Sequence, residues 1–147
     1  MKKLIILSLL SAFSASAFST TVTHPGSNCR STSASDTQYQ ITQGRFRATN
    51  SMYGKSVTCP ISRPSLNTPF FDAKLNYSNS VYSCKLVETA KNGVRKEYSP
   101  TSSSSGTYGW HYLDSGSTPS NPYESSYAIN CTMAYNGYIN NYYLREN

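Results

Sequence analysis

The sequence has few charged side chains and, beyond its N-terminus, no long hydrophobic run. Only 14% of its 147 residues are charged, and the mean hydropathy is −0.49. Such low charge argues against a coiled coil or a basic nucleic-acid-binding arm, and the polar average argues against a bundle of membrane helices. The chain is instead rich in tyrosine, with 13 residues, and in Ser, Thr and Asn. This composition is typical of one globular domain.

The only long apolar run resembles an export signal. Lys2 and Lys3 precede apolar residues 4–10, and Ala15-Ser16-Ala17 offers the small residues that signal peptidase requires. We expect cleavage after Ala17 and no stable membrane insertion afterwards, because a membrane-spanning helix needs about 20 apolar residues. The sequence therefore predicts a secreted or periplasmic protein with a signal peptide (1–17), an extended N-terminal leader (18–36) and a single domain (37–147).

Positive charge is too thinly spread to predict a nucleic-acid partner. Of the 13 Lys and Arg residues, Lys2 and Lys3 belong to the signal, which leaves 11 against 7 Asp and Glu, a net charge of +4. The remaining cations stand singly or as one pair, so we expect no nucleic-acid binding. Only a mild attraction to anionic surfaces remains.

Four cysteines in an exported chain predict a disulfide framework. Three connectivities are possible, and we favour Cys29 with Cys59 and Cys84 with Cys131. Cys84 and Cys131 each fall on the apolar face of an alternating run, whereas Cys29 and Cys59 flank the first hairpin-like region. Each bond would contribute roughly 3.5 to 4 kcal/mol in the chain-entropy description.

Short segments with period-2 alternation predict an all-β fold. Lys91-Asn92-Gly93 predicts a hairpin with a type I′ turn, and residues 99–106 and 114–121 are predicted to be flexible loops. The expected fold class is a disulfide-stapled antiparallel β-sandwich of jelly-roll or Greek-key type. The predicted strands are 38–42, 45–50, 55–59, 71–77, 81–88, 94–98, 107–113, 127–134 and 140–146.

The cysteine environments carry a resemblance. Cys59-Pro60-x-x-Arg63, the segments around Cys84 and Cys131, and the closing aromatic residues 142–146 resemble an uncharacterised family of small exported bacterial proteins with four cysteines. The similarity extends over most of residues 24–146, although the prolines expected just after the fourth cysteine are absent. The resemblance implies a disulfide-bonded β-sandwich and assigns no catalytic or binding residues.

No motif in the sequence indicates catalysis, a cofactor or a metal, and we expect a non-enzymatic protein. His111 lies near Asp114, but the chain has no G-x-S-x-G motif to present a nucleophile. Neither His24 nor His111 lies at ligand spacing from a cysteine, and C-x-x-C is absent, which argues against zinc. Asp114 is the only carboxylate in a loop that faintly resembles a calcium site, and a hard cation needs several.

Tyr108, Trp110 and Tyr112 form the one pattern that suggests binding. Their spacing places all three rings on one face of a strand, where they could stack on sugars while nearby Asn and Ser bond the hydroxyls. We favour the other interpretation, a core face, because a chain poor in aliphatic residues must build its core from tyrosine. The function predicted overall is non-enzymatic recognition of a glycan or another exported protein; the alternative is a small inhibitor or interaction protein acting on a secreted enzyme.

Overall fold

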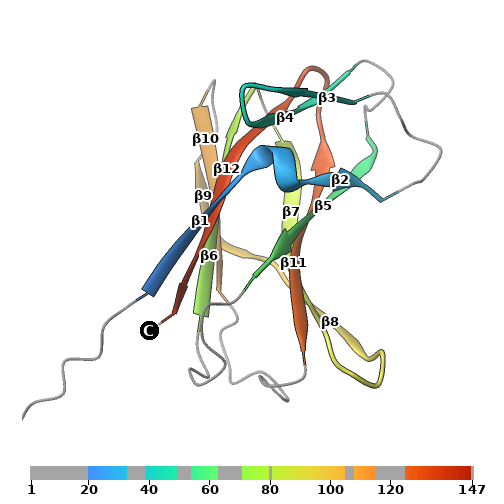
Figure 1. Ribbon diagram of the computed structural model, residues 1–147, viewed down its shortest axis with the longest axis vertical. Coiled ribbons are helices and arrows are strands. Elements are labelled where there is room, and N and C mark those ends of the chain that lie inside the picture. Colours follow the sequence, from blue (N-terminus) through green and yellow to red (C-terminus); the bar gives the residue numbers. More distant parts are fainter. Residues whose placement is uncertain are drawn as a thin grey trace, which may run out of the picture.

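Two antiparallel β-sheets pack face to face, as the sequence predicts for a β-sandwich (Figure 1). The computed structural model describes residues 20–32, 39–49, 54–62, 71–79, 81–104, 108–114 and 125–146. The larger sheet comprises β1 (Thr20–Pro25), β3 (Tyr39–Thr42), β4 (Arg45–Ala48), β6 (Phe71–Ser78), β9 (Pro100–Ser104), β10 (Tyr108–Asp114) and β12 (Tyr138–Glu146). The smaller sheet comprises β2 (Arg30–Ser31), β5 (Ser56–Ile61), β7 (Val81–Thr89), β8 (Arg95–Tyr98) and β11 (Ser126–Met133).

The chain crosses repeatedly between the sheets, so strands adjacent in space are distant in sequence. The larger sheet runs β3-β4-β12-β6-β10-β9, with β1 also paired to β12, and the smaller runs β2-β5-β11-β7-β8. The central strands of both sheets therefore depend on long-range pairing. A single 3-10 turn, η1 (Gly26–Asn28), follows β1. The described part of the chain holds no helix with the length and hydropathy needed to cross a membrane.

The core lies between the sheets and is built from alternate residues of their strands. In β6, Ala73, Leu75 and Tyr77 are buried, while Lys74 and Asn76 stay partly exposed on the other face. The largest fully buried side chains are Tyr142, Phe46, Leu75, Leu86, Leu113, Ile129, Met133, Ile139, Leu144 and Glu88.

Both disulfide bonds lie in this core, in the pairing that the sequence favours. Cys84 and Cys131 are directly opposite each other on β7 and β11 and join neighbouring strands of one sheet. Cys29 and Cys59 join the segment after η1 to β5. At most 2% of any of the four residues is exposed, so the bonds are shielded from solvent by the packed sheets.

Three strands lie where the sequence predicts none. Thr20–Pro25 and Arg30–Ser31, which the sequence places in an extended leader, form β1 and β2, and β1 pairs with β12 over its whole length. The prediction of a loop over 99–106 is wrong for Pro100–Ser104, which forms β9 at the edge of the larger sheet. The predicted signal peptide (1–17) and residues 115–121 of the other predicted loop lie outside the described residues.

The predicted hairpin joins β7 to β8, but its turn is not type I′. A type I′ turn needs positive φ at two successive residues, and here Gly93 has φ 82° while Asn92 does not share it. The side chain of Asn92 instead accepts a hydrogen bond from the Val94 amide (3.1 Å). Two successive positive φ angles occur at Gln43 (52°) and Gly44 (74°), in the tight connection between β3 and β4.

Candidate functional site

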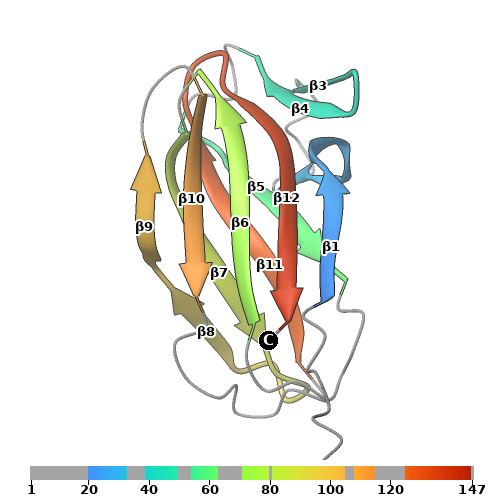
Figure 2. The same cartoon turned by 90° about the vertical axis from the view of Figure 1, so that its left-hand side faces the viewer.

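The aromatic row of β10 lies on the solvent side of the larger sheet. Tyr108 is 80% exposed, and Trp110 and Tyr112 are partly exposed. Figure 2 looks onto this side of the sheet, where β10, β6 and β12 run side by side. The expectation that the row belongs to the core is therefore wrong, and the alternative of a surface row describes its position.

The residues between the rings explain this orientation. Gly109, His111 and Leu113 face the core, and Leu113 is fully buried. The ring of Tyr77 lies over Gly109 so closely that a Cβ there would come within 2.2 Å of it. His111 stacks on the same ring, with centroids 5.0 Å apart. A small residue, a stacked imidazole and one leucine thus fill the core side of β10 and leave the three large rings outside.

Cross-strand register extends the row into a broader surface. Tyr112 lies opposite Lys74 on β6, which lies opposite Tyr143 on β12. Trp110 lies opposite Asn76, which lies opposite Asn141 in the same two strands. We call this surface the aromatic face and define it by Lys74, Asn76, Tyr108, Trp110, Tyr112, Asn141 and Tyr143.

Polar groups lie between the rings of the aromatic face. The Asn76 side-chain amide donates to the Asn141 carbonyl oxygen (2.6 Å), which leaves the Asn76 oxygen and the Asn141 amide able to bond a ligand. The Lys74 ammonium lies 5.0 Å from the centroid of the Trp110 ring, a cation–π distance. Hydrogen-bonding groups and a cation therefore border the largest ring.

One end of the aromatic face is fixed by a buried carboxylate. Asp72 on β6 is 3% exposed and accepts hydrogen bonds from the Tyr112 hydroxyl (2.5 Å) and from Nη2 (2.5 Å) and Nε (3.0 Å) of Arg145. Burial, and then the hydrogen bond to Asp72, raises the pKa of Tyr112. The hydroxyl therefore stays protonated and holds the ring in place.

The other end carries two arginines around a tyrosine. Tyr138 lies opposite Arg47 where β12 meets β4, and the guanidinium carbons of Arg45 and Arg47 each lie 5.4 Å from the centroid of its ring. Arg47 Nη1 also donates to the Gln40 side chain (3.3 Å), and its buried Nε has no hydrogen-bond partner. The face thus ends in two cations held against an aromatic ring.

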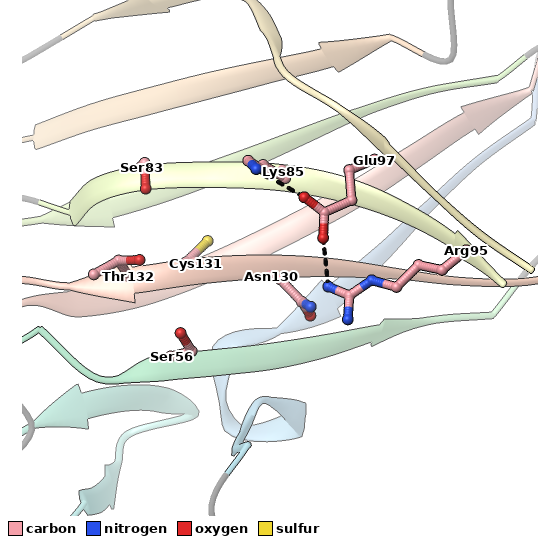
Figure 3. A pocket seen from close by; sticks show the side chains of 8 residues that line it. All are labelled: Ser56, Ser83, Lys85, Arg95, Glu97, Asn130, Cys131 and Thr132. Carbon is pink, nitrogen blue, oxygen red and sulfur yellow. Dashed lines mark hydrogen bonds and ion pairs between the residues drawn. The ribbon is translucent and has the colours of Figure 1, made fainter.

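The opposite face of the sandwich carries a polar depression of about 190 Å3 over the smaller sheet (Figure 3). Within it the Glu97 carboxylate lies between Lys85 (2.7 Å) and Arg95 (2.8 Å). The hydrogen bond and charge of Lys85, and then Arg95, lower the pKa of Glu97. The charges of this depression are therefore internally paired. Its lining residues are Ser56, Ser83, Lys85, Arg95, Glu97, Asn130, Cys131 and Thr132.

The two histidines point into the core. His24 stacks on Tyr142, with centroids 5.1 Å apart, and burial lowers the pKa of His111. In this position His111 is shielded from solvent rather than presented to a substrate. Within the described residues, no group of three or more His, Cys, Asp or Glu is placed to hold a metal ion.

The aromatic face could be predicted only in part from the sequence. Period-2 spacing identifies Tyr108, Trp110 and Tyr112 as one row, but nothing in the local sequence links them to Asn76 or Asn141. Asn76 and Asn141 lie beside the row because strands from segments more than 30 residues apart in the sequence pair with one another. A search for aromatic and amide residues at alternate positions of other predicted strands would have found them as candidates, without their register.

Comparison with models of protein families finds no match, and comparison with curated protein sequences finds none either. Among solved structures, the chain is similar to the C-terminal CBM6 of LamC, a marine laminarinase from Zobellia galactanivorans, with 12% identity and a TM-score of 0.48 over 86% of this chain and 100% of that one. It is also similar to the GH26-CBM35 β-(1,4)-mannanase of Podospora anserina, with 14% identity and a TM-score of 0.39. That match covers 86% of this chain but 28% of the mannanase. At this level of similarity, neither protein's ligand nor its activity is transferred to this chain.

Proposed function

We propose that this protein is an exported, non-enzymatic glycan-binding protein and that a polysaccharide binds across the aromatic face of the larger sheet. The observation that carries the proposal is the outward position of Tyr108, Trp110 and Tyr112. Three adjacent rings on the outer surface of a sheet do not contribute to packing of the core. Exposed apolar area of this kind costs free energy unless a ligand covers it.

Aromatic rings match the apolar faces of pyranose sugars. A pyranose presents C–H groups on its flat faces, and a ring stacked on them removes apolar area from water without needing to satisfy a polar group. Tyr108 and Trp110 are two residues apart on one strand, so their Cα atoms are separated by roughly 6.5 Å. That separation suits two neighbouring sugar units of an extended chain.

The amide pair beside Trp110 supplies hydrogen bonds for sugar hydroxyls. The hydrogen bond between the two side chains uses the Asn76 amide and the Asn141 oxygen, so the Asn76 oxygen and the Asn141 amide are an acceptor and a donor that this bond does not use. A hydroxyl can both donate and accept, and vicinal hydroxyls therefore suit such a pair. Rings give the affinity in this arrangement, and amides give the orientation.

Retention on immobilised polysaccharides tests the proposal. We expect the mature protein to be retained by at least one polymer in a panel and Trp110→Ala to bind that polymer roughly tenfold more weakly, equivalent to about 1.4 kcal/mol. Tyr135→Ala is the matched control, because Tyr135 is 55% exposed in the turn between β11 and β12 and lies outside the aromatic face.

The same experiment distinguishes glycan binding from the alternative function, an inhibitor or interaction protein that acts on a secreted enzyme. An inhibitor or interaction protein would bind no polysaccharide and would instead co-purify with another exported protein. Absence of retention by every polymer, or equal binding by the wild type and Trp110→Ala, would contradict glycan recognition by this face.

A further inference from the structure

We infer, on the basis of the proposed glycan-binding function, that the polysaccharide is acidic and that Lys74, Arg45 and Arg47 bind its negatively charged groups. The shared chemistry of such ligands is a sugar that carries a carboxylate or a sulfate ester. The inference rests on which cations of the sandwich lack acidic partners and on where those cations lie.

Three cations that pair with no described acid lie on one side of the larger sheet. Of the four described cations on that side, Arg145 is bound by Asp72, the only acid among the outward-facing side chains described there. Lys74, Arg45 and Arg47 contact rings and side-chain amides and form no ion pair with a described acid. No described acid therefore neutralises these three positive charges, which favours an anionic ligand on this surface.

The cations of the depression over the smaller sheet are paired with an acid. Lys85 and Arg95 share the Glu97 carboxylate at 2.7 and 2.8 Å, so the positive charge of that depression is partly neutralised (Figure 3). An anion gains little there, because it would have to compete with Glu97 or lie beside it. The contrast in pairing, rather than the net charge of the chain, distinguishes the two faces.

Each available cation lies against an aromatic ring. Lys74 lies 5.0 Å from the Trp110 ring centroid, and Arg45 and Arg47 lie 5.4 Å from that of Tyr138. A sugar stacked on ring area that the cation does not cover would place its ring substituents next to that cation. An acid group on that sugar can then form a charge-assisted bond, which is about twice as strong as a neutral hydrogen bond.

Arg47 offers the most direct anchor for an anion. Its Nε is buried without a hydrogen-bond partner, whereas its Nη1 donates to Gln40. An anion would therefore reach the planar guanidinium at its Nη groups, where a carboxylate or sulfate oxygen can accept a charge-assisted hydrogen bond.

A polysaccharide fits these observations better than a single-stranded nucleic acid. Three cations divided between two ends of the face do not form the continuous groove that follows a phosphate backbone. The Asn76–Asn141 amide pair between the two ends instead matches hydroxyls. Preferential binding of a nucleic acid would therefore contradict the inference, and the test includes an oligonucleotide for this reason.

The test compares two doubly substituted mature proteins that lose the same charge. Lys74→Gln with Arg47→Gln, called the aromatic-face variant, alters the aromatic face and the arginine end next to it. Lys85→Gln with Arg95→Gln, called the opposite-face variant, alters the opposite face. Binding is measured by affinity electrophoresis in gels containing polygalacturonate, its fully methyl-esterified form, dextran sulfate, dextran or a thymidine oligonucleotide. Circular dichroism checks the fold of each variant, and Lys74→Gln alone serves if the double variant does not fold.

We expect the wild type and the opposite-face variant to bind polygalacturonate or dextran sulfate alike, and the aromatic-face variant to bind at least tenfold more weakly. Preference for polygalacturonate identifies a carboxylate ligand, and preference for dextran sulfate identifies a sulfate ester. Binding should weaken as salt is raised, because screening acts on partly exposed charges.

Three outcomes would overturn the inference. Equal retention by the methyl-esterified and acidic polymers, still lost in Trp110→Ala, would leave glycan binding intact and remove the acidic ligand. Equal loss in both double variants would mean that net charge alone attracts the polymer. Binding of the oligonucleotide in preference to every polysaccharide would contradict both the acidic glycan and the proposed function.

Discussion

At the scale of single residues, burial sets the ionisation of His111. Burial lowers the pKa of His111 from 6.5, so the folded protein binds fewer protons than the unfolded chain below that pH. The contribution of neutral, buried His111 to the free energy of unfolding is fully present above pH 6.5 and is lost as the pH falls through the lowered pKa. We predict that denaturant midpoints fall on acidification and that His111→Phe reduces this fall. Equal pH dependence in wild type and variant would contradict the burial of His111.

A buried and a partly buried tyrosine predict the opposite behaviour at high pH. Burial raises the pKa of Tyr98 and of Tyr142 from 10.0 to about 12, and Tyr98 also donates a hydrogen bond to Glu88 (2.8 Å). The folded protein then holds protons that the unfolded chain releases, so stability is present below pH 10 and is lost towards pH 12. We expect Tyr142→Phe to reduce the fall in the free energy of unfolding at alkaline pH, as measured by urea unfolding. Substitution of the exposed Tyr135 by Phe should leave it unchanged.

At the scale of elements, a close backbone contact fixes η1, just after β1, against β12. A Cβ added at Gly26, just after β1, would lie 1.9 Å from the backbone oxygen of Ile139, which cannot yield as a side chain would. We predict that Gly26→Ala lowers the free energy of unfolding by about 3 kcal/mol or more. Gly54→Ala is the control: nothing lies within 4 Å of its added Cβ, and its φ of 71° costs only about 1 kcal/mol. Similar losses in both would contradict the predicted contact.

Which strands the sequence predicts depends on how each strand buries its side chains. All nine predicted strands are present. Alternate apolar residues face the core in β6, β7 and β11, whereas β3 and β8 expose most of their residues. In β9, Thr101, Ser102 and Ser103 are exposed and only backbone pairing with β10 makes the segment a strand. β1 presents Val22 and the buried His24 to the core, a pattern too short and too polar for periodicity to identify. Edge strands that carry neither an apolar pattern nor an adjoining hairpin motif therefore escape sequence analysis, whereas the Asn92-Gly93 turn indicates the edge strand β8.

The candidate site was predictable as a row but not as a surface. Tyr108, Trp110 and Tyr112 share a face by spacing alone, yet the side of the sheet they occupy depends on Tyr77, more than 30 residues earlier, which covers Gly109. Cations and amides join the rings through register between β10, β6 and β12. Long-range pairing of this kind has no local signature.

At the scale of the whole molecule, two buried disulfide bonds restrict the unfolded chain. The Cys84–Cys131 bond spans 47 residues, and its removal by paired substitution with alanine should cost about 4 kcal/mol. Because the sulfurs are shielded, we predict that thiol reductant and alkylating agent leave the folded protein unlabelled, and that labelling accelerates in denaturant. Mass spectrometry measures the label. Rapid labelling of the folded protein would contradict the buried position of both bonds.

The emission of Trp110 tests the central claim most directly, because the chain contains one tryptophan. Its position beside Lys74 and on the open side of β10 predicts that acrylamide quenches the fluorescence of the folded protein. We expect a bound acidic polysaccharide to shift the emission and to protect it from acrylamide, with half of the full effect at the concentration that gives half-retention in gels. Emission that no polysaccharide alters, although the polymer retains the protein, would show that the glycan binds elsewhere and would contradict the aromatic face as the binding site.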